Sequence, residues 1–187
     1  MAGTNLYSVY RRTARAAAQQ HVVKKTSNID VERARVDFAY FCDVVGDKPP
    51  AEHHKEWHSY LCTATNSECL IGIGGPNIDI LAPRGSAKST VLGLYTAWAI
   101  GVHALHKKPL KILYISYTVD VARPKSAAIK RIIEESKIYK EIFPTVKIAK
   151  GINSNEDWSI DWKFAGIKST GEKEFTICCA CLKCAVT

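Results

Sequence analysis

The chain has 187 residues, of which 47% are hydrophobic, so it can form one ordinary domain with a buried core and an additional arm. Its formal charge of +8 favours polyanionic partners such as nucleic acids, although a solvated basic surface explains that charge almost as well. A membrane span and a secretory signal are excluded because no apolar run is long enough, and we expect a soluble, intracellular protein.

Residues 1–29 form a basic segment with no acidic residue before Asp30. The run "RRTARAAAQQHVV" in this segment is rich in alanine and prone to form a helix, but its apolar residues make no clean stripe. The composition overlaps with that of organelle transit peptides. A basic helical arm explains it equally well, and we favour the arm.

Two helices are predicted on either side of the breaker "GDKPP", which a helix cannot cross without a kink. The first covers residues 28–46, where apolar residues recur at roughly helical spacing. The second covers residues 49–65 and includes His53 and His54, for which packing and capping are the expected roles. These helices form a lead-in to the segment that comes next in the chain.

An alternation of strands and helices is predicted after "GIGGPN". We expect a buried strand over 78–83, a mostly buried helix over 88–106, a second strand over 111–118 and a helix over 120–143. Asp120 is the candidate N-cap of that last helix. This order builds a parallel sheet with right-handed crossovers, so the predicted fold class is α/β.

The chain becomes polar beyond Pro144, and two later runs read as a pair of strands. These runs are "SIDWKFAGI" over 159–167 and "EFTICCACL" over 174–182, joined by "KSTGEK". We see no repeats and no low-complexity tract.

The stretch "ILAPRGSAKST" resembles a phosphate-binding P-loop, whose pattern is G-x-x-x-x-G-K-[ST]. Both glycine positions are substituted, by Ala82 and Ala87, and the nearby Gly85 can absorb the most demanding bend. In a P-loop, backbone N–H groups face the phosphates, the lysine (here Lys88) reaches the β- and γ-phosphates, and the hydroxyl (here Ser89) carries Mg²⁺. The alternative is an ordinary turn with both residues at a helix start.

The carboxylates that would complete an ATPase site are hard to find in this sequence. A hydrolytic P-loop enzyme needs a strand that ends in a Mg²⁺-coordinating Asp, followed by a catalytic Glu. Asp120 follows a run that is too polar, and Asp161 follows no strand at all. We interpret these two residues as a helix cap and a loop residue, so no residue is assigned to the hydrolytic half of the site.

The seven cysteines do not predict a metal site. Cys42, Cys62 and Cys69 stand singly, as reduced buried thiols do. The cluster "CCACLKC" holds one C-x-x-C pair, Cys181 and Cys184, whereas a structural zinc site normally recruits two ligand pairs. We expect no structural metal there.

Three pieces in order make the chain similar to the N-terminal ATPase part of the large terminase subunit of tailed bacteriophages, the motor that packages DNA. They are "PAEHHKEWHSYL", "ILAPRGSAKST" and "KILYISYTVDVARPKSAAIKRIIEES". The likeness covers residues 30 to 187. The family commonly writes its loop as P-R-G-x-[GA]-K-S-T, which accommodates Ala87.

The resemblance implies a P-loop NTPase core with a mainly parallel sheet, preceded by a helical N-terminal segment. It implies ATP and Mg²⁺ as cofactors, Arg84 and Lys88 as catalytic residues, and Ser89 as the metal ligand. The nucleotide-binding residues implied are Pro83, Arg84, Gly85, Ser86, Ala87, Lys88, Ser89 and Thr90. Its implied partners are double-stranded DNA, the small terminase subunit, the portal protein and further copies of the chain, in the host cytoplasm and away from membranes.

The sequence departs from the family where "CLKCAVT" replaces the segment that leads into the second ATPase motif. We therefore interpret the chain as an incomplete terminase, with a basic arm and helical lead-in over 1–66 and a partial P-loop ATPase domain over 67–187. We expect it to bind ATP with little or no turnover. Two alternatives stay open: a non-catalytic nucleotide- or DNA-binding module, and a helicase-like ATPase that depends on nucleic acid.

Overall fold

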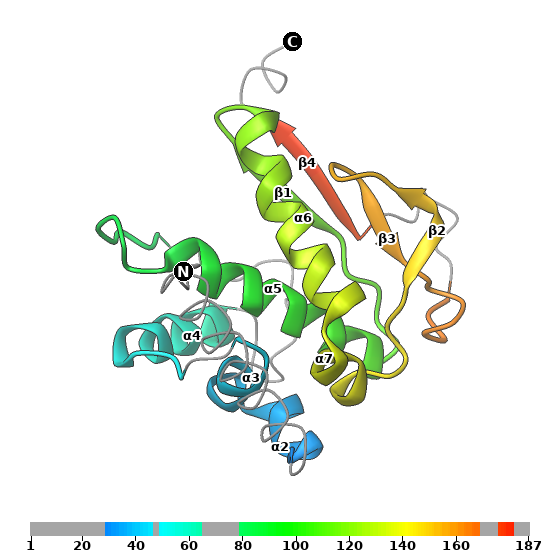
Figure 1. Cartoon of the computed structure of the whole chain (residues 1–187), viewed down its shortest axis with the longest axis horizontal. Coiled ribbons are helices and arrows are strands. Elements are labelled where there is room, and N and C mark those ends of the chain that lie inside the picture. Colours follow the sequence, from blue (N-terminus) through cyan, green and yellow to red (C-terminus); the bar gives the residue numbers. More distant parts are fainter. Residues whose placement is uncertain (1–28, 47–48, 65–78, 169–175, 182–187) are drawn as a thin grey trace, which may run out of the picture. The chain divides into compact units, whose positions relative to one another are not determined.

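The computed structural model describes residues 29–46, 49–64, 79–168 and 176–181 (Figure 1). The chain divides after Asp30 into two units, and every described helix and strand belongs to the second, Val31–Thr187. The described residues of this unit form an α/β fold, as the sequence predicts. The helices are α2 (Val31–Val36), α3 (Phe38–Val45), α4 (Glu52–Ala64), α5 (Lys88–Leu105), α6 (Val119–Glu135) and α7 (Lys137–Ile142). The strands are β1 (Ile112–Ser116), β2 (Ile148–Asn153), β3 (Trp158–Ile160) and β4 (Ile177–Cys181).

The sheet is mixed, with strand order β1-β4-β3-β2. β1 and β4 are parallel, and their register runs from Ile112 opposite Ile177 to Ser116 opposite Cys181. β3 is antiparallel to β4 and to β2. The expectation of a mainly parallel sheet is therefore wrong for the described strands.

The strand missed by sequence reasoning is β2, which pairs with β3 across a polar turn. The Ser154 hydroxyl accepts hydrogen bonds from the backbone N–H groups of Asp157 and Glu156, at 2.7 and 3.1 Å. A serine side chain that bonds backbone amides two and three residues ahead stabilises a tight turn. The polar stretch after Pro144 is thus partly a hairpin.

The strand predicted over 78–83 is absent from its described part, residues 79–83. Leu81 is 95% exposed, and no described strand pairs with this segment. An apolar run becomes a strand only when a neighbour accepts its backbone hydrogen bonds, and no described strand does so here. The segment that leads into the loop before α5, residues 79–83, therefore has no regular secondary structure.

Two predicted helices are each divided by a capping residue. The Asp37 carboxylate accepts a 3.1 Å hydrogen bond from Tyr40 N–H and begins α3, while the Ser136 hydroxyl does the same for Tyr139 N–H and begins α7. Such side chains offer the backbone an alternative partner and favour N-caps. Asp120 is not an N-cap as predicted, because α6 begins one residue earlier and Thr118 occupies that place.

The core is built around α5, which lies between helices on one side and α6 on the other (Figure 1). The Trp98 side chain is 1% exposed, and its indole N–H donates to the Ala34 carbonyl at 3.1 Å. The Tyr139 hydroxyl donates to the Ala97 carbonyl at 2.9 Å. These buried bonds tie α5 to α2 and α7, so the residues just before α5 are presented by a rigid helix.

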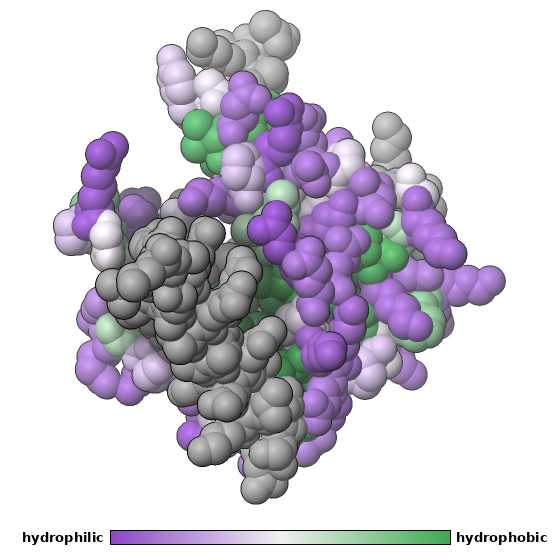
Figure 2. All heavy atoms as spheres, viewed as in Figure 1, coloured by the Kyte–Doolittle hydropathy of each residue, from purple (hydrophilic) through white to green (hydrophobic). Residues whose placement is uncertain are grey.

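The second packing layer joins α6 to the sheet. The Trp158 indole N–H donates to the Ser126 hydroxyl at 2.8 Å, which connects β3 with α6. The viewed face is mostly hydrophilic over the described residues (Figure 2). Among the helices described, none has the length and apolar character needed to cross a bilayer.

Candidate functional site

The predicted phosphate loop lies at the N-terminal end of α5. Residues Ala82 to Thr90 line an open cavity of about 390 Å³. Gly85 and Ala87 have backbone φ angles of +87° and +56°, both in the left-handed region, on either side of Ser86. Alternating backbone conformations of this kind turn successive N–H groups toward one concave side, which is how anion-binding loops are made.

Ala87 carries the strain of this loop. A left-handed conformation costs a residue with a Cβ about 1–2 kcal/mol, and glycine avoids most of that cost. Gly85 adopts one of the two left-handed conformations without strain, as the sequence predicts, whereas Ala87 adopts the other with the strain of its Cβ. Contacts with the surrounding structure must therefore stabilise the left-handed conformation of Ala87.

Several backbone donors of the loop are unused. The backbone N–H groups of Gly85, Ala87, Lys88 and Ser89 donate no hydrogen bond to any residue that the structure describes. Ala87 also gives α5 no side-chain cap. Because a helix N-terminus carries partial positive charge and free N–H groups, these donors suit a phosphate.

The side chains of the predicted set surround the same cavity. Lys88 is half-buried, and its ammonium donates to the Ile80 carbonyl at 3.3 Å, a weak bond that leaves two further donor hydrogens. Ser89 and Thr90 are exposed. Arg84 is exposed in the turn, and it forms no ion pair with any residue that the structure describes.

The chemistry of this donor set fits a nucleotide with magnesium. Backbone N–H groups and an ammonium match phosphate oxygens, and the Ser89 hydroxyl is an oxygen ligand of the kind that Mg²⁺ takes. Mg²⁺ usually keeps several waters and is held through substrate phosphates together with protein oxygens, so the Ser89 hydroxyl would supply one of its ligands. In the described parts of the chain there is no cluster of three or more His, Cys, Asp or Glu residues that could hold a metal ion.

The two candidate carboxylates for hydrolysis are engaged in local interactions. Asp120 pairs with Arg123 at 3.1 Å, and the same arginine contacts Glu156. The Asp161 carboxylate accepts a 2.9 Å hydrogen bond from Phe164 N–H in the turn after β3. Asp161 is therefore a loop residue, as the sequence predicts, but it comes directly after β3, so the prediction that no strand precedes it is wrong.

His54 makes the contact with the loop that sequence reasoning missed. Its Nε2 lies 2.8 Å from the Ser86 carbonyl oxygen, and its Nδ1 lies 3.2 Å from the Ala51 nitrogen. The bond to Ala51 is the expected capping interaction at the start of α4. The bond to Ser86 joins residues 32 positions apart, and no local sequence pattern indicates it.

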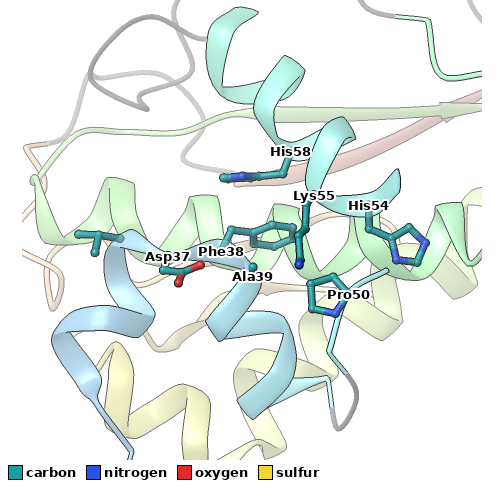
Figure 3. Close-up of a pocket in the computed structure, with 8 residues that line it drawn as sticks. Asp37, Phe38, Ala39, Pro50, His54, Lys55 and His58 are labelled. Atoms are coloured by element: carbon teal, nitrogen blue, oxygen red, sulfur yellow. The ribbon is translucent and has the colours of Figure 1, made fainter. Parts of the chain in front are cut away.

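A smaller cavity, of about 280 Å³, lies between the start of α3 and α4, and His54 is one of its lining residues (Figure 3). The His58 and Phe38 rings in its wall stack at 4.7 Å. Burial lowers the pKa of His58, and the nearby Asp37 carboxylate partly offsets this effect. His54 thus stands between an aromatic-lined cavity and the loop.

The structure describes the side chains of two cysteines, Cys42 and Cys178. Cys42 is a buried free thiol, as expected, and burial together with the Asp37 charge raises its pKa to about 12. Cys178 is half-buried on β4. Cys69 lies outside the described residues, as do the side chains of Cys62 and of the C-x-x-C pair.

The fold and the site together define an α/β protein in which a strained, glycine-containing loop opens a long helix. Comparison of the chain with known protein families, with curated proteins and with solved structures finds no match.

Proposed function

We propose that the chain binds ATP with Mg²⁺ through residues 83–90, as the nucleotide-binding part of a DNA-packaging motor of the large terminase class. One observation carries the proposal: two left-handed residues, Gly85 and Ala87, shape the loop in front of α5, where the Gly85 and Ala87 N–H groups have no partner in the described structure and Ser86 N–H bonds the Pro83 carbonyl. Unpaired N–H groups occur at any helix N-terminus, but an ordinary turn before a helix does not need two left-handed residues on either side of one position. A P-loop core is part of this proposal.

The loop residues have distinct roles in this proposal. The backbone N–H groups and the positive end of α5 hold the β- and γ-phosphates. Lys88 exchanges its weak bond with the Ile80 carbonyl for a phosphate oxygen, which is a stronger, charge-assisted partner. Ser89 holds the metal that the nucleotide brings. Arg84, exposed in the turn, extends toward the terminal phosphate.

The second candidate function is a nucleotide-binding module without catalysis. It is favoured by the local bonds of Asp120 and Asp161, which leave no described carboxylate assigned to the loop. The motor part and the module without catalysis both bind nucleotide through the loop, so in either case binding should depend on Lys88. Because no described carboxylate is assigned to the loop, we expect negligible steady-state hydrolysis.

The partners of the motor are proposed from the resemblance, with the net charge of +8 as additional support for double-stranded DNA. Contacts with a small terminase subunit, a portal protein and further copies of the chain follow from the resemblance alone, as does the host cytoplasm.

Calorimetric titration with ATP and Mg²⁺ tests the proposal. Lys88→Ala should abolish detectable binding, whereas Lys125→Ala, which removes the same charge from an exposed site on α6, should bind as the wild type does. Equal affinity in the wild type and Lys88→Ala would remove the loop from the binding site. Steady ATP hydrolysis that disappears in Lys88→Ala would refute the low-turnover version and show that a catalytic carboxylate exists.

A further inference from the structure

We infer that His54 is a positioning residue, which holds the Ser86–Ala87 peptide in the orientation that lets the loop accept phosphate. This role deepens the proposed nucleotide binding and rests on it. Its basis is the 2.8 Å bond between His54 Nε2 and the Ser86 carbonyl oxygen, made from α4 to the centre of the loop.

The hydrogen bonds of His54 determine its tautomer. Ala51 N–H can only donate, so the Nδ1 atom that it faces at 3.2 Å must accept. In a neutral imidazole the other nitrogen then carries the hydrogen, and Nε2–H donates to the Ser86 carbonyl. Ring contacts with Trp57 at 5.1 Å and His53 at 4.0 Å further restrict the ring.

The bond to Ser86 determines where the next N–H group points. The peptide is trans, so its carbonyl oxygen and the following N–H lie on opposite sides. With the Ser86 oxygen directed at His54, the Ala87 N–H is directed away from α4 and stays unbonded among the described residues. Rotation of the Ser86–Ala87 peptide plane would turn the Ala87 N–H to point in the opposite direction.

The same rotation would also relieve Ala87. This peptide sets the φ of Ala87, which is +56° and disfavoured for alanine. Without the His54 bond, the residue can relax toward negative φ and the N–H leaves the phosphate side. With glycine at position 87 there is no strain to drive this rotation, because glycine adopts positive and negative φ about equally readily.

Single and double variants, compared by calorimetric titration with ATP and Mg²⁺, test this role. His54→Ala should weaken binding about tenfold, the loss expected for a partly buried hydrogen bond and the donor that it aligns. His54→Gln should recover most of that loss, since its amide N–H₂ can donate from a similar distance. His106→Ala, a change at an exposed histidine beyond the C-terminal end of α5, should have no effect.

The decisive variant combines His54→Ala with Ala87→Gly and should bind within about threefold of the wild type, because glycine needs no partner to stay left-handed. A histidine that merely supported the packing of α4 would not be replaced by a glycine in the loop. Loss of binding in His54→Ala that neither Ala87→Gly nor His54→Gln restores would overturn the positioning role.

The tautomer supplies a readout that requires no nucleotide. Imidazole nitrogen NMR of the wild type should show the His54 hydrogen on Nε2, and a hydrogen on Nδ1 would overturn the inference. If His54→Ala does not fold, the NMR measurement and the ATP affinity of His54→Gln test the inference instead. If Lys88→Ala abolishes ATP binding and His54→Ala binds normally, the positioning role is refuted and the proposed nucleotide binding is retained. If Lys88→Ala binds ATP normally, the proposed nucleotide binding itself is refuted.

Discussion

Arg84 illustrates how a single exposed residue can be assigned by charge and place. It lies in the turn next to Gly85 and has no carboxylate partner in the described segments. An unpaired guanidinium beside a phosphate loop is free to form a bidentate contact with a phosphate. The catalytic role implied by the resemblance stays a prediction.

Replacing Arg84 by alanine should separate the nucleotides by their charge. We expect Arg84→Ala to weaken ATP binding about tenfold, the size of one partly exposed charge-assisted bond, and to leave ADP binding within about twofold. Calorimetry with both nucleotides measures the difference. An equal loss for ATP and ADP would assign Arg84 to the general electrostatic field of the loop.

At the scale of the element, α5 is the part of the fold on which the site depends. Its middle and C-terminal residues are buried almost all round, including both Trp98 and Gly101. A helix of this kind is held by packing more than by helix propensity. Its N-terminus is consequently fixed in space while the loop before it stays exposed.

Two glycines in α5 should respond to alanine in opposite ways. At Gly101 a Cβ would lie 2.5–2.6 Å from the ring of the fully buried Phe143, so we expect Gly101→Ala to lower the free energy of unfolding by about 1–3 kcal/mol. At Gly93 a Cβ would meet Ile129 at an ordinary 3.7 Å, so Gly93→Ala should raise it by about 0.5–1 kcal/mol. Chemical denaturation measures both.

The contrast between these variants tests the close approach of α5 to Phe143, the C-cap residue of α7. A free energy of unfolding that Gly101→Ala leaves unchanged or raises would contradict the close approach of Gly101 to Phe143. The stabilised Gly93→Ala variant is also a convenient background for the His54 and Ala87 comparisons, since it lies on α5 beyond the residues that line the loop cavity.

At the scale of the whole molecule, a buried histidine links stability to pH. The His103 side chain is 4% exposed, and neither ring nitrogen has a hydrogen-bond partner in the parts of the chain described. Burial lowers the pKa of His103 to about 4, with smaller lowering effects from Lys108 and His106. The folded protein therefore keeps this imidazole neutral where the unfolded chain, with the ordinary pKa of 6.5, takes up a proton.

The free energy of unfolding should fall as the pH drops from about 6.5 to about 4, because only the unfolded state gains a proton at His103 in that window. We expect a loss on the order of 1–3 kcal/mol. Urea denaturation at pH 7.5, 6 and 5 measures it. His103→Leu should reduce the loss, with the remainder due in part to His58, whose pKa is lowered chiefly by burial. An unchanged pH dependence in His103→Leu would remove this histidine as the cause.

Local sequence chemistry was sufficient for the elements whose partners lie nearby. The helix from Lys88 and the strand over Ile112–Ser116 appear where apolar periodicity predicts them, and Asp161 is a loop residue as expected. The loop candidates were also identified locally, because the P-loop pattern spans only eight positions. Their nucleotide role stays a prediction, and the domain boundary after residue 66 does as well.

What the sequence by itself determined is therefore the α/β class, the long helix α5 and the place of the loop before it, all consequences of side-chain type and spacing along a few turns of chain. Tertiary structure alone decided that the sheet is mixed, that residues 79–83 pair with no described strand, and that His54 reaches Ser86. The physical reason is that strand pairing and the His54 bond join segments that are distant in sequence. Which donor meets which acceptor then depends on how the helices pack, and no spacing rule encodes it.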